Sequence, residues 1–292
     1  MLMTIHEARQ QLISDLVGIY DTSEAANIAE LVTEHITGWL HTERIKNKEI
    51  LLSPNQLEHL DKIIERLKQN EPVQYALEEA WFAGMKFHVD KNVLIPRTET
   101  EELVEWVVKD INIQHSPLNK QYSIIDIGTG SGCIPISIKK KISQADVSAV
   151  DVCSEALFVA TNNAINLEAD VNFILLDFLD ENKWNELGRY DIIVSNPPYV
   201  RQNEATAMHL RVTGFEPHLA LFVPDNDALI FYKAIAAFGN TYLKPGGCIY
   251  VEINEASGKE ITELFRSNNY SSVELKKDMQ GKDRMIKVIS GL

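Results

Sequence analysis

The sequence has no long apolar run, few cysteines and a shortage of basic residues, and each absence excludes a class of protein. No stretch reaches about 18 consecutive apolar residues, so we expect no membrane-spanning helix. The first residues, Met1 to Gln11, include His6, Glu7 and Arg9 and lack the apolar core of a secretory signal. We therefore expect a cytoplasmic protein with no membrane partner.

Cysteine and histidine are too scattered to predict a metal or disulfide site. The three cysteines, Cys133, Cys153 and Cys248, have neither the spacing of metal ligands nor that of a redox pair. None of the eight histidines stands four residues from another with a glutamate between them. Unpaired thiols of this kind are typical of the reducing cytosol, and no metal is expected.

Basic charge is scarce, with 28 Lys and Arg residues against 42 Asp and Glu residues and a formal net charge of −14. A protein that grips a nucleic-acid backbone usually presents a basic surface, because neutralising phosphates supplies most of the affinity. The charge therefore argues against nucleic acid as a direct substrate and suits a neutral or basic protein partner.

The amino-terminal quarter is expected to be helical. Apolar residues recur at helical spacing in residues 23–40, and Ser53-Pro54-Asn55-Gln56 has the serine cap and first-turn proline of a helix start. A hairpin with strands Met85–Val89 and Val93–Ile95 is expected next. The sequence thus predicts a helical domain at residues 1–72, which recognises a partner or shields a site, and a linker with the hairpin at residues 73–97.

Residues 98–292 are expected to form an α/β domain, because strand-like runs alternate there with helical patterns. Such alternation is typical of a mostly parallel sheet with right-handed crossovers. The last two runs have only a polar loop between them and should pair antiparallel at one edge. The expected strands are Ser123–Ile127, Val147–Asp151, Asn172–Leu176, Asp191–Ser195, Cys248–Ile253, Ser272–Leu275 and Met285–Ser290.

A glycine-rich loop, Asp126-Ile127-Gly128-Thr129-Gly130-Ser131-Gly132, follows the first of these strands. Its glycines let the backbone turn tightly and approach a ligand, but the spacing is not that of dinucleotide folds and no Walker lysine follows. Asp151 ends the next strand, where it can accept hydrogen bonds from both ribose hydroxyls. These residues leave nicotinamide, flavin and S-adenosylmethionine open as cofactors. Phe178, after the third strand, is equally compatible with covering an adenine and with the core.

The fourth strand runs into Asn196-Pro197-Pro198-Tyr199, which we name the acceptor shelf. Two prolines cannot continue a sheet, and the residue before each is held extended, so we expect a rigid ledge at the end of this strand. The Asn196 side-chain oxygen and the Pro197 carbonyl can accept both hydrogens of an NH2 group, with the Tyr199 ring over its plane. Hydride transfer has no use for two such acceptors, so the loop and shelf together favour methyl transfer from S-adenosylmethionine to nitrogen.

The sequence resembles the release-factor glutamine N5-methyltransferases over nearly its whole length. This resemblance implies a class I S-adenosylmethionine-dependent methyltransferase fold, α/β, in which a seven-stranded mostly parallel sheet ends in an antiparallel strand, with a small helical domain before it. The resemblance is carried by Glu71-Pro72-x-x-Tyr75, Phe82-x-Gly84-x-x-Phe87-x-Val89, Val93-Leu94-Ile95-Pro96-Arg97, Glu99-Thr100-Glu101, Asp126 to Cys133, Asn196 to Tyr199, Phe215-Glu216-Pro217, Ala220-Leu221 and Pro245-Gly246-Gly247.

The resemblance also implies a reaction, a partner and a set of site residues. The methyl acceptor would be the glutamine in the Gly-Gly-Gln loop of class 1 peptide chain release factors, the product of the cofactor would be S-adenosylhomocysteine, and we expect the enzyme to be a monomer. Asn196, Pro197, Pro198 and Tyr199 would hold the glutamine amide. The cofactor would be held by Ile127, Gly128, Thr129, Gly130, Ser131, Asp151, Phe178 and Asn196.

Two other functions stay open at this stage. The same tetrapeptide can hold the amino group of a flipped adenine, so N6 methylation of DNA or RNA is the nearest alternative. The net charge and the absence of a basic recognition domain argue against it. A non-catalytic scaffold is the other alternative, and the intact loop, Asp151 and shelf argue against that.

Overall fold

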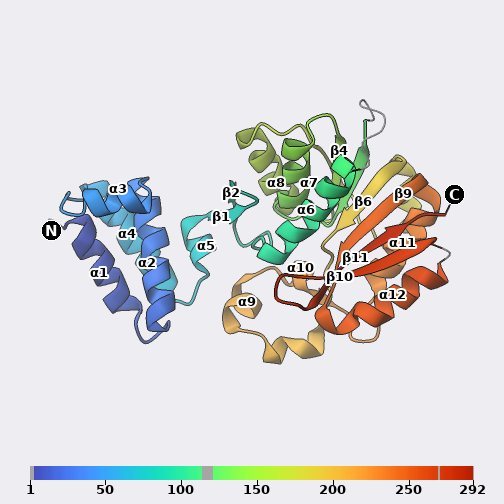
Figure 1. Ribbon diagram of the computed structural model, residues 1–292. Coiled ribbons are helices and arrows are strands. Elements are labelled where there is room, and N and C mark those ends of the chain that lie inside the picture. The colour runs from blue at the N-terminus through green and yellow to red at the C-terminus, as the bar shows by residue number, and fades with distance from the viewer. Residues whose placement is uncertain (1–2, 114–120, 269, 292) are drawn as a thin grey trace. The chain divides into compact units, whose positions relative to one another are not determined.

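The computed structural model describes residues 3–113, 121–268 and 270–291, and the chain divides into two compact units. One consists of Met1–Glu79 with Leu210–Phe215, and the other of Ala80–His209 with Glu216–Leu292 (Figure 1). The domain boundaries expected from the sequence stay a prediction, because compactness in space does not show where a domain folds independently.

The smaller unit is helical, as predicted. The helices are α1 (Ile5–Leu16), α2 (Thr22–Thr37), α3 (His41–Lys46), α4 (Pro54–Lys68), α5 (Val73–Leu77) and α9 (Leu210–Phe215). Helices α1, α2, α4 and α5 share one apolar core, in which Leu12, Leu16, Val32 and Leu67 are fully buried.

Local capping sets where these helices begin and end. The Ser53 hydroxyl accepts from the Gln56 N–H at 3.3 Å and the Gln56 side chain accepts from the Ser53 N–H at 2.9 Å, which confirms the predicted start of α4. The apolar spacing predicted that α2 would run to Leu40, but it ends at Thr37. Gly38 has a φ of 69°, and this left-handed conformation closes a helix.

Helix α9 belongs to the helical unit although it lies far along the chain, between β7 (Val200–Arg201) and β8 (Phe222–Val223). The Arg211 guanidinium donates to the Glu24 carboxylate at 2.6 Å and lies 3.9 Å from the centre of the Tyr20 ring. An arginine that both pairs with a carboxylate and stacks on a ring is held firmly in place.

A seven-stranded sheet, ordered β10-β11-β9-β6-β3-β4-β5, forms the centre of the larger unit (Figure 1). Strand β11 runs antiparallel to both of its neighbours, and the remaining pairs are parallel, so the predicted fold is confirmed. The strands of this sheet are β3 (Ser123–Ile127), β4 (Asp146–Asp151), β5 (Asn172–Leu175), β6 (Tyr190–Ser195), β9 (Leu243–Glu252), β10 (Ser272–Lys277) and β11 (Asp283–Ile289).

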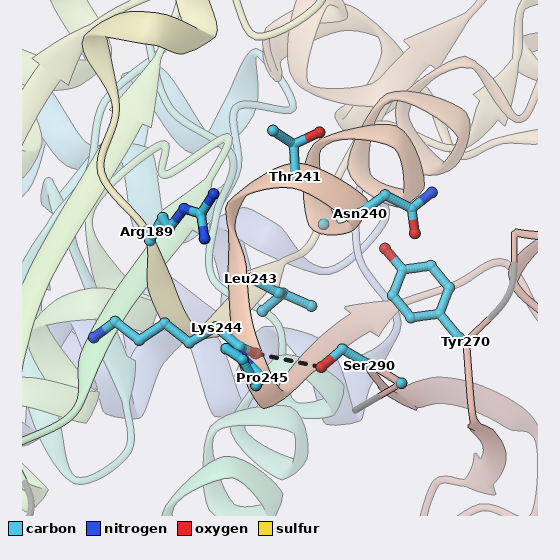
Figure 2. Close-up of a pocket in the computed structure, with 10 residues that line it drawn as sticks. Arg189, Asn240, Thr241, Leu243, Lys244, Pro245, Tyr270 and Ser290 are labelled. Atoms are coloured by element: carbon cyan, nitrogen blue, oxygen red, sulfur yellow. Dashed lines mark hydrogen bonds between the residues drawn. The ribbon is translucent and has the colours of Figure 1, made fainter.

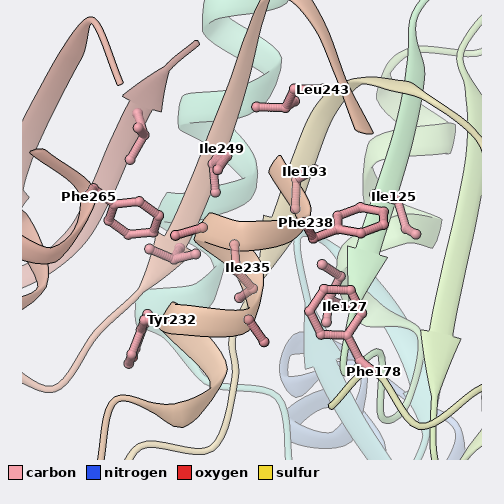
Figure 3. Close-up of a cluster of buried hydrophobic side chains, with 14 of the residues drawn as sticks. Ile125, Ile127, Phe178, Ile193, Tyr232, Ile235, Phe238, Leu243, Ile249 and Phe265 are labelled. Carbon is pink, nitrogen blue, oxygen red and sulfur yellow. The ribbon is translucent and has the colours of Figure 1, made fainter. Parts of the chain in front are cut away.

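Alternate residues of the central strands face two different helical layers. Ile124 and Ile192 pack into the cluster formed with α6, α7 and α8, whereas Ile125 and Ile193 pack into the cluster formed with α11 and α12 (Figure 3). Because both faces are covered, these strands carry apolar residues on both faces instead of on one face only. The helices and turns of this unit are α6 (Thr98–Ile113), α7 (Cys133–Lys141), α8 (Ser154–Asn166), α10 (His218–Leu221), α11 (Ile230–Tyr242), α12 (Gly258–Ser267) and short 3₁₀ turns at Glu181–Glu186, Gln202–Ala207 and Glu255–Ser257.

The predicted hairpin is wrong by one strand. The structure pairs β1 (Glu79–Phe82) with β2 (Met85–His88) around Ala83 and Gly84, whose φ angles of 51° and 77° suit a two-residue hairpin turn. After β2 the Asp90 carboxylate accepts from the Asn92 N–H at 2.9 Å, which closes a side-chain turn instead of a strand-to-strand turn. Val93 to Ile95 therefore join no strand.

A buried asparagine, Asn163 of α8, fastens β2 to the glycine-rich loop. Its side-chain oxygen accepts from the His88 N–H at 2.7 Å, and its side-chain nitrogen donates to the His88 and Ser131 carbonyls, each at 2.9 Å. The asparagine is 1% exposed, and these bonds satisfy its buried side-chain amide.

Candidate active site

The carboxyl ends of the parallel strands open into one cavity of about 380 Å³ within the larger unit. Ligands of open α/β sheets bind at this edge. Both sequence motifs contribute to its wall. Of the residues predicted to hold cofactor or acceptor, Tyr199 is not part of the lining, and the others are: Ile127, Gly128, Thr129, Gly130, Ser131, Asp151, Phe178, Asn196, Pro197 and Pro198.

The glycine-rich loop passes the cavity with its backbone exposed to it. Gly128 and Gly130 have φ angles of +76° and +52°, and a Cβ added to either would meet nothing within 4 Å. At Gly132 an added Cβ would lie 3.1 Å from the Ala160 Cβ, so this glycine is needed for α7 to approach α8. The first two glycines thus leave room for a ligand, and the third allows close packing of the helices.

Asp151, at the end of β4, holds the loop and keeps acceptor capacity for a ligand. Its carboxylate accepts from the Gly130 N–H at 2.8 Å and from the Cys153 N–H at 3.0 Å, each on a different oxygen. Burial raises the pKa of Asp151, and these hydrogen bonds oppose the rise. Because each carboxylate oxygen has two lone pairs, Asp151 can still accept from the two hydroxyls of a ribose.

Phe178 lies at the cavity wall and is also part of the core. It is 5% exposed and packs on Trp184 and Phe238, with ring centres 5.5 and 5.3 Å away. The Trp184 indole N–H donates to the Phe178 carbonyl at 2.9 Å. Its position is compatible with covering an adenine, and that role stays a prediction.

Asp126 is a buried carboxylate without a hydrogen-bond partner among the described residues. It is 0% exposed, near the end of β3, and is the first residue of the glycine-rich loop. Burial raises the pKa of Asp126 to about 7; the nearby Thr129 hydroxyl opposes the rise, although it does not reach hydrogen-bond geometry, and the charge of Asp151 adds to it. A cationic ligand in the adjoining cavity would stabilise the ionised form of this carboxylate.

The acceptor shelf begins where β6 is locked to β3, because the Ser195 hydroxyl donates to the Ile127 carbonyl at 2.7 Å. The Asn196 side-chain nitrogen donates to the Thr100 hydroxyl oxygen at 3.1 Å. The Tyr199 hydroxyl donates to the Glu252 carboxylate at 3.2 Å, and burial raises the pKa of this phenol. The predicted stacking of the Tyr199 ring on an amide stays a prediction.

Sequence reasoning missed two residues that hold the shelf, Thr100 and Glu252. Glu252 ends β9, is 1% exposed and also accepts from the Thr100 hydroxyl at 2.6 Å. Burial raises the pKa of Glu252 to about 7, and its hydrogen bonds and the charge of Arg284 oppose the rise. In the sequence, Glu252 is recognisable only as an acidic residue at the end of an apolar strand. No sequence pattern connects it to Thr100, which lies 152 residues earlier.

An ion pair closes another part of the wall. The Arg97 guanidinium donates to the Glu216 carboxylate at 2.6 Å, and the Glu216 side chain is 2% exposed. The second Glu216 oxygen accepts from the Ile95 N–H at 3.2 Å. Glu216 thus joins the segment that enters α6 to the segment before α10.

These residues fit S-adenosylmethionine. This cofactor has a ribose diol, which suits Asp151, and a sulfonium and an ammonium, which suit a cavity lined by Ile127, the residue that follows the buried Asp126 carboxylate. The open backbone at Gly128 and Gly130 admits a close ligand. Among the described residues no cluster of three or more His, Cys, Asp and Glu side chains could hold a metal ion. No helix in the same part of the chain is both long and apolar enough to cross a membrane.

A second cavity, of about 410 Å³, lies at the opposite end of the sheet, where β9 begins (Figure 2). Its wall includes Arg189, Asn240, Lys244 and Tyr270. Lys244 already donates to the Asp191 carboxylate at 2.9 Å and to the Ser123 hydroxyl at 2.6 Å, so this lysine holds the strands together. We therefore place the chemistry in the first cavity.

Two family models match the chain. The model described as "PrmC N-terminal domain" matches residues 7–77, and the model described as "Methyltransferase small domain" matches residues 110–213.

Curated relatives match over nearly the full length. A "Release factor glutamine methyltransferase" of Flavobacterium psychrophilum is 43% identical over 98% of this chain and 99% of that protein. A protein of the same name from Bacteroides thetaiotaomicron is 42% identical over 93% of this chain and 95% of that protein.

Solved structures are similar in fold at low sequence identity. A Thermus thermophilus 16S rRNA methyltransferase, crystallised with AdoMet and guanosine, has a TM-score of 0.52 and 17% identity, covering 73% of this chain and 49% of that one. The hMettl16 catalytic domain, crystallised with an RNA hairpin, has a TM-score of 0.53 and 17% identity, covering 82% of each chain. At this identity the likeness supports the methyltransferase fold.

Proposed function

Because the chain belongs to the family of release factor glutamine methyltransferases, we propose that it methylates the side-chain amide nitrogen, N5, of the glutamine in the Gly-Gly-Gln loop of class 1 peptide chain release factors. The methyl donor is S-adenosylmethionine and the products are the methylated factor and S-adenosylhomocysteine.

One observation carries the assignment of residues. Asn196 and Pro197 line the same cavity as Gly128, Gly130 and Asp151. An amide bound by the shelf would therefore meet the methyl donor inside one enclosure. This arrangement supports a direct transfer between two bound reactants.

The residues of the shelf would do most of the work by positioning. A carboxamide nitrogen is a weak nucleophile because its lone pair is delocalised into the carbonyl. The two N–H groups of the amide donate hydrogen bonds to the Asn196 oxygen and to the Pro197 carbonyl. These two bonds direct the nitrogen lone pair away from the shelf. Orientation of this kind supplies up to about 7–11 kcal/mol of a reaction barrier, and fixed dipoles add to it.

Bound S-adenosylmethionine supplies a methyl group on a positively charged sulfur. The amide nitrogen forms the new N–C bond, the C–S bond breaks with its electron pair passing to sulfur, and the nitrogen then loses one proton to solvent. No side chain is required as a strong base. Asp151 and the glycine-rich loop would keep the donor in place while the shelf presents the acceptor.

The proposal includes a partner and a place of action. Release factors act in translation, so we place the enzyme in the cytoplasm, as a monomer that recognises a protein and not a nucleic acid. The formal net charge of −14 supports a protein partner over a polyanion.

The test is incubation with S-adenosylmethionine labelled in its methyl group. A class 1 release factor should take up the label, and the same factor with the glutamine of its Gly-Gly-Gln loop replaced by alanine should take up none. DNA and RNA serve as competing acceptors. Label in adenine, or equal label in the glutamine-free factor, would contradict the proposal.

A further inference from the structure

Four side chains from three distant parts of the sequence, two of them in the acceptor shelf, form one hydrogen-bonded chain. The Asn196 side-chain nitrogen donates to Thr100 at 3.1 Å, the Thr100 hydroxyl donates to Glu252 at 2.6 Å, and the Tyr199 hydroxyl donates to the other Glu252 oxygen at 3.2 Å. Thr100 and Glu252 are 2% and 1% exposed, so water does not compete for the bond between these two residues. Asn196 and Thr100 also line the cavity.

The direction of every bond in this chain follows from the charge at its end. An ionised carboxylate only accepts hydrogen bonds, so Thr100 and Tyr199 must each donate their single hydroxyl hydrogen to Glu252. The Thr100 oxygen then has only lone pairs left for Asn196, which must turn its NH2 group towards it. Because a carboxamide is planar and its two branches diverge, the Asn196 oxygen is left for other partners.

We propose that Glu252, acting through Thr100, is the positioning residue that fixes the Asn196 side-chain oxygen, and not its nitrogen, as the atom offered to the substrate amide. This inference rests on the proposed function, in which the substrate presents an NH2 group. We call the hydrogen-bonded sequence Glu252, Thr100, Asn196 the relay. If its bond directions are reversed, the Asn196 NH2 group faces the substrate NH2 group and neither can accept a hydrogen bond.

A proton on Glu252 is one way to reverse the relay. A protonated carboxyl can donate to Thr100, whose hydroxyl can then donate to Asn196 and draw the amide oxygen away from the cavity.

Burial raises the pKa of Glu252 to about 7, and Arg284 of β11 opposes the rise while Glu99 of α6 adds to it. On the other sides, Tyr232 of α11 donates to the Glu252 backbone carbonyl at 2.9 Å, and Tyr199 contacts the carboxylate. Burial and the charge of Glu252 raise the pKa of the Cys133 thiol at the start of α7.

The kinetic test replaces Glu252 by its amide. Glu252→Gln keeps the shape but can donate to Thr100, and we expect kcat to fall about 10- to 100-fold, as misplacement of a reacting group does. The Kd for S-adenosylmethionine should stay within about twofold, since the hydrogen bonds of Asp151 and the glycine-rich loop are untouched. Glu105→Gln, an exposed carboxyl-to-amide change on α6, is the matched control and should leave kcat unchanged.

Two further readouts separate positioning from simple stability. Thr100→Val should lose activity as Glu252→Gln does, whereas Thr100→Ser, which keeps the hydroxyl, should retain it. The wild-type kcat should rise with pH through about 7 as Glu252 ionises, and this limb should be absent in Glu252→Gln. A limb that survives in Glu252→Gln, or a Thr100→Val variant with normal kcat, overturns the relay.

An NMR readout needs no methyl acceptor. In selectively labelled protein at pH 8, the Asn196 NH2 protons should show a nuclear Overhauser effect to the Thr100 methyl group, and Glu252→Gln should abolish it. Its absence in wild-type protein overturns the relay even if release factors are methylated. Its presence, in an enzyme that fails to label any release factor, supports the orientation of Asn196 and rejects the proposed substrate.

Discussion

Two buried carboxylates at the edge of the sheet, Asp126 and Glu252, have the same raised pKa of about 7 and opposite surroundings. Asp126, the first residue of the glycine-rich loop, has no hydrogen-bond partner among the described residues. Glu252, behind the acceptor shelf, accepts from both Thr100 and Tyr199. One carboxylate is therefore buried without a compensating donor, and the other is part of a hydrogen-bonded network.

This difference matches what each end of the cavity has to do. In the proposed function, the end with the glycine-rich loop needs affinity for a cationic ligand, and a buried charge next to that end would provide it because the ligand relieves the cost of burial. The acceptor end needs a fixed direction for two hydrogen bonds, and a fully bonded network provides that by restricting rotation. The comparison thus predicts that damage at the shelf affects turnover and damage at the loop affects cofactor binding.

The largest effect is expected for Asn196→Ala. Without its side-chain oxygen the substrate amide loses one of its two acceptors, and we expect kcat to fall at least about 1,000-fold, at the upper end for removal of one transition-state contact. Binding of S-adenosylmethionine, measured by calorimetry, should fall far less. Asn240→Ala, an exposed asparagine in the second cavity, is the control, and near-normal turnover of Asn196→Ala would remove the mechanism.

A smaller effect is expected for Asp151→Ala, and it should appear in cofactor binding instead of in turnover. The change removes the acceptor of the Gly130 and Cys153 N–H groups and of a ribose diol, and hydrogen bonds to a charged group contribute about 1.5–3 kcal/mol. The Kd for S-adenosylmethionine should rise roughly 10- to 100-fold. At saturating cofactor, kcat should recover most of its wild-type value. Asp146→Ala, at the exposed start of β4, should change neither, and a kcat loss as large as that of Asn196→Ala would break the comparison.

The smallest effect is expected for Asp126→Asn and Glu252→Gln, on the Tm of the protein without ligand. Because the folded-state pKa of Asp126 lies above its unfolded value, its contribution is favourable below about pH 4 and is lost as pH rises through about 7. Asp126→Asn should therefore raise the Tm by several degrees at pH 8, with a gain that shrinks towards pH 5. Glu252→Gln should gain less at pH 8, because two donors already compensate that carboxylate. Equal gains, measured by calorimetry across pH, would show that the two carboxylates do not differ.

The sequence was informative wherever the signal is local. The ends of β3 and β6 follow from runs such as Ile124–Ile127 and from prolines that stop a strand, and the loop and shelf are contiguous motifs. The hairpin was misplaced because Asp90 supports a side-chain turn as readily as a strand-to-strand turn. Glu252 was overlooked because its partners come from α6 and from the shelf, and only the folded sheet brings these together.

The hydrogen bonds of Asn163 couple strand β2 to the glycine-rich loop, and this coupling affects how the protein responds to a ligand. One side chain ties the backbone of β2 to the loop at Ser131, so neither segment can shift without straining the other. Thermodynamic linkage is reciprocal: whatever steadies the hairpin tightens the hold on the donor, and a bound donor steadies the hairpin by the same free energy. Strand β2 is thereby coupled to the loop that we propose holds the nucleoside part of the donor.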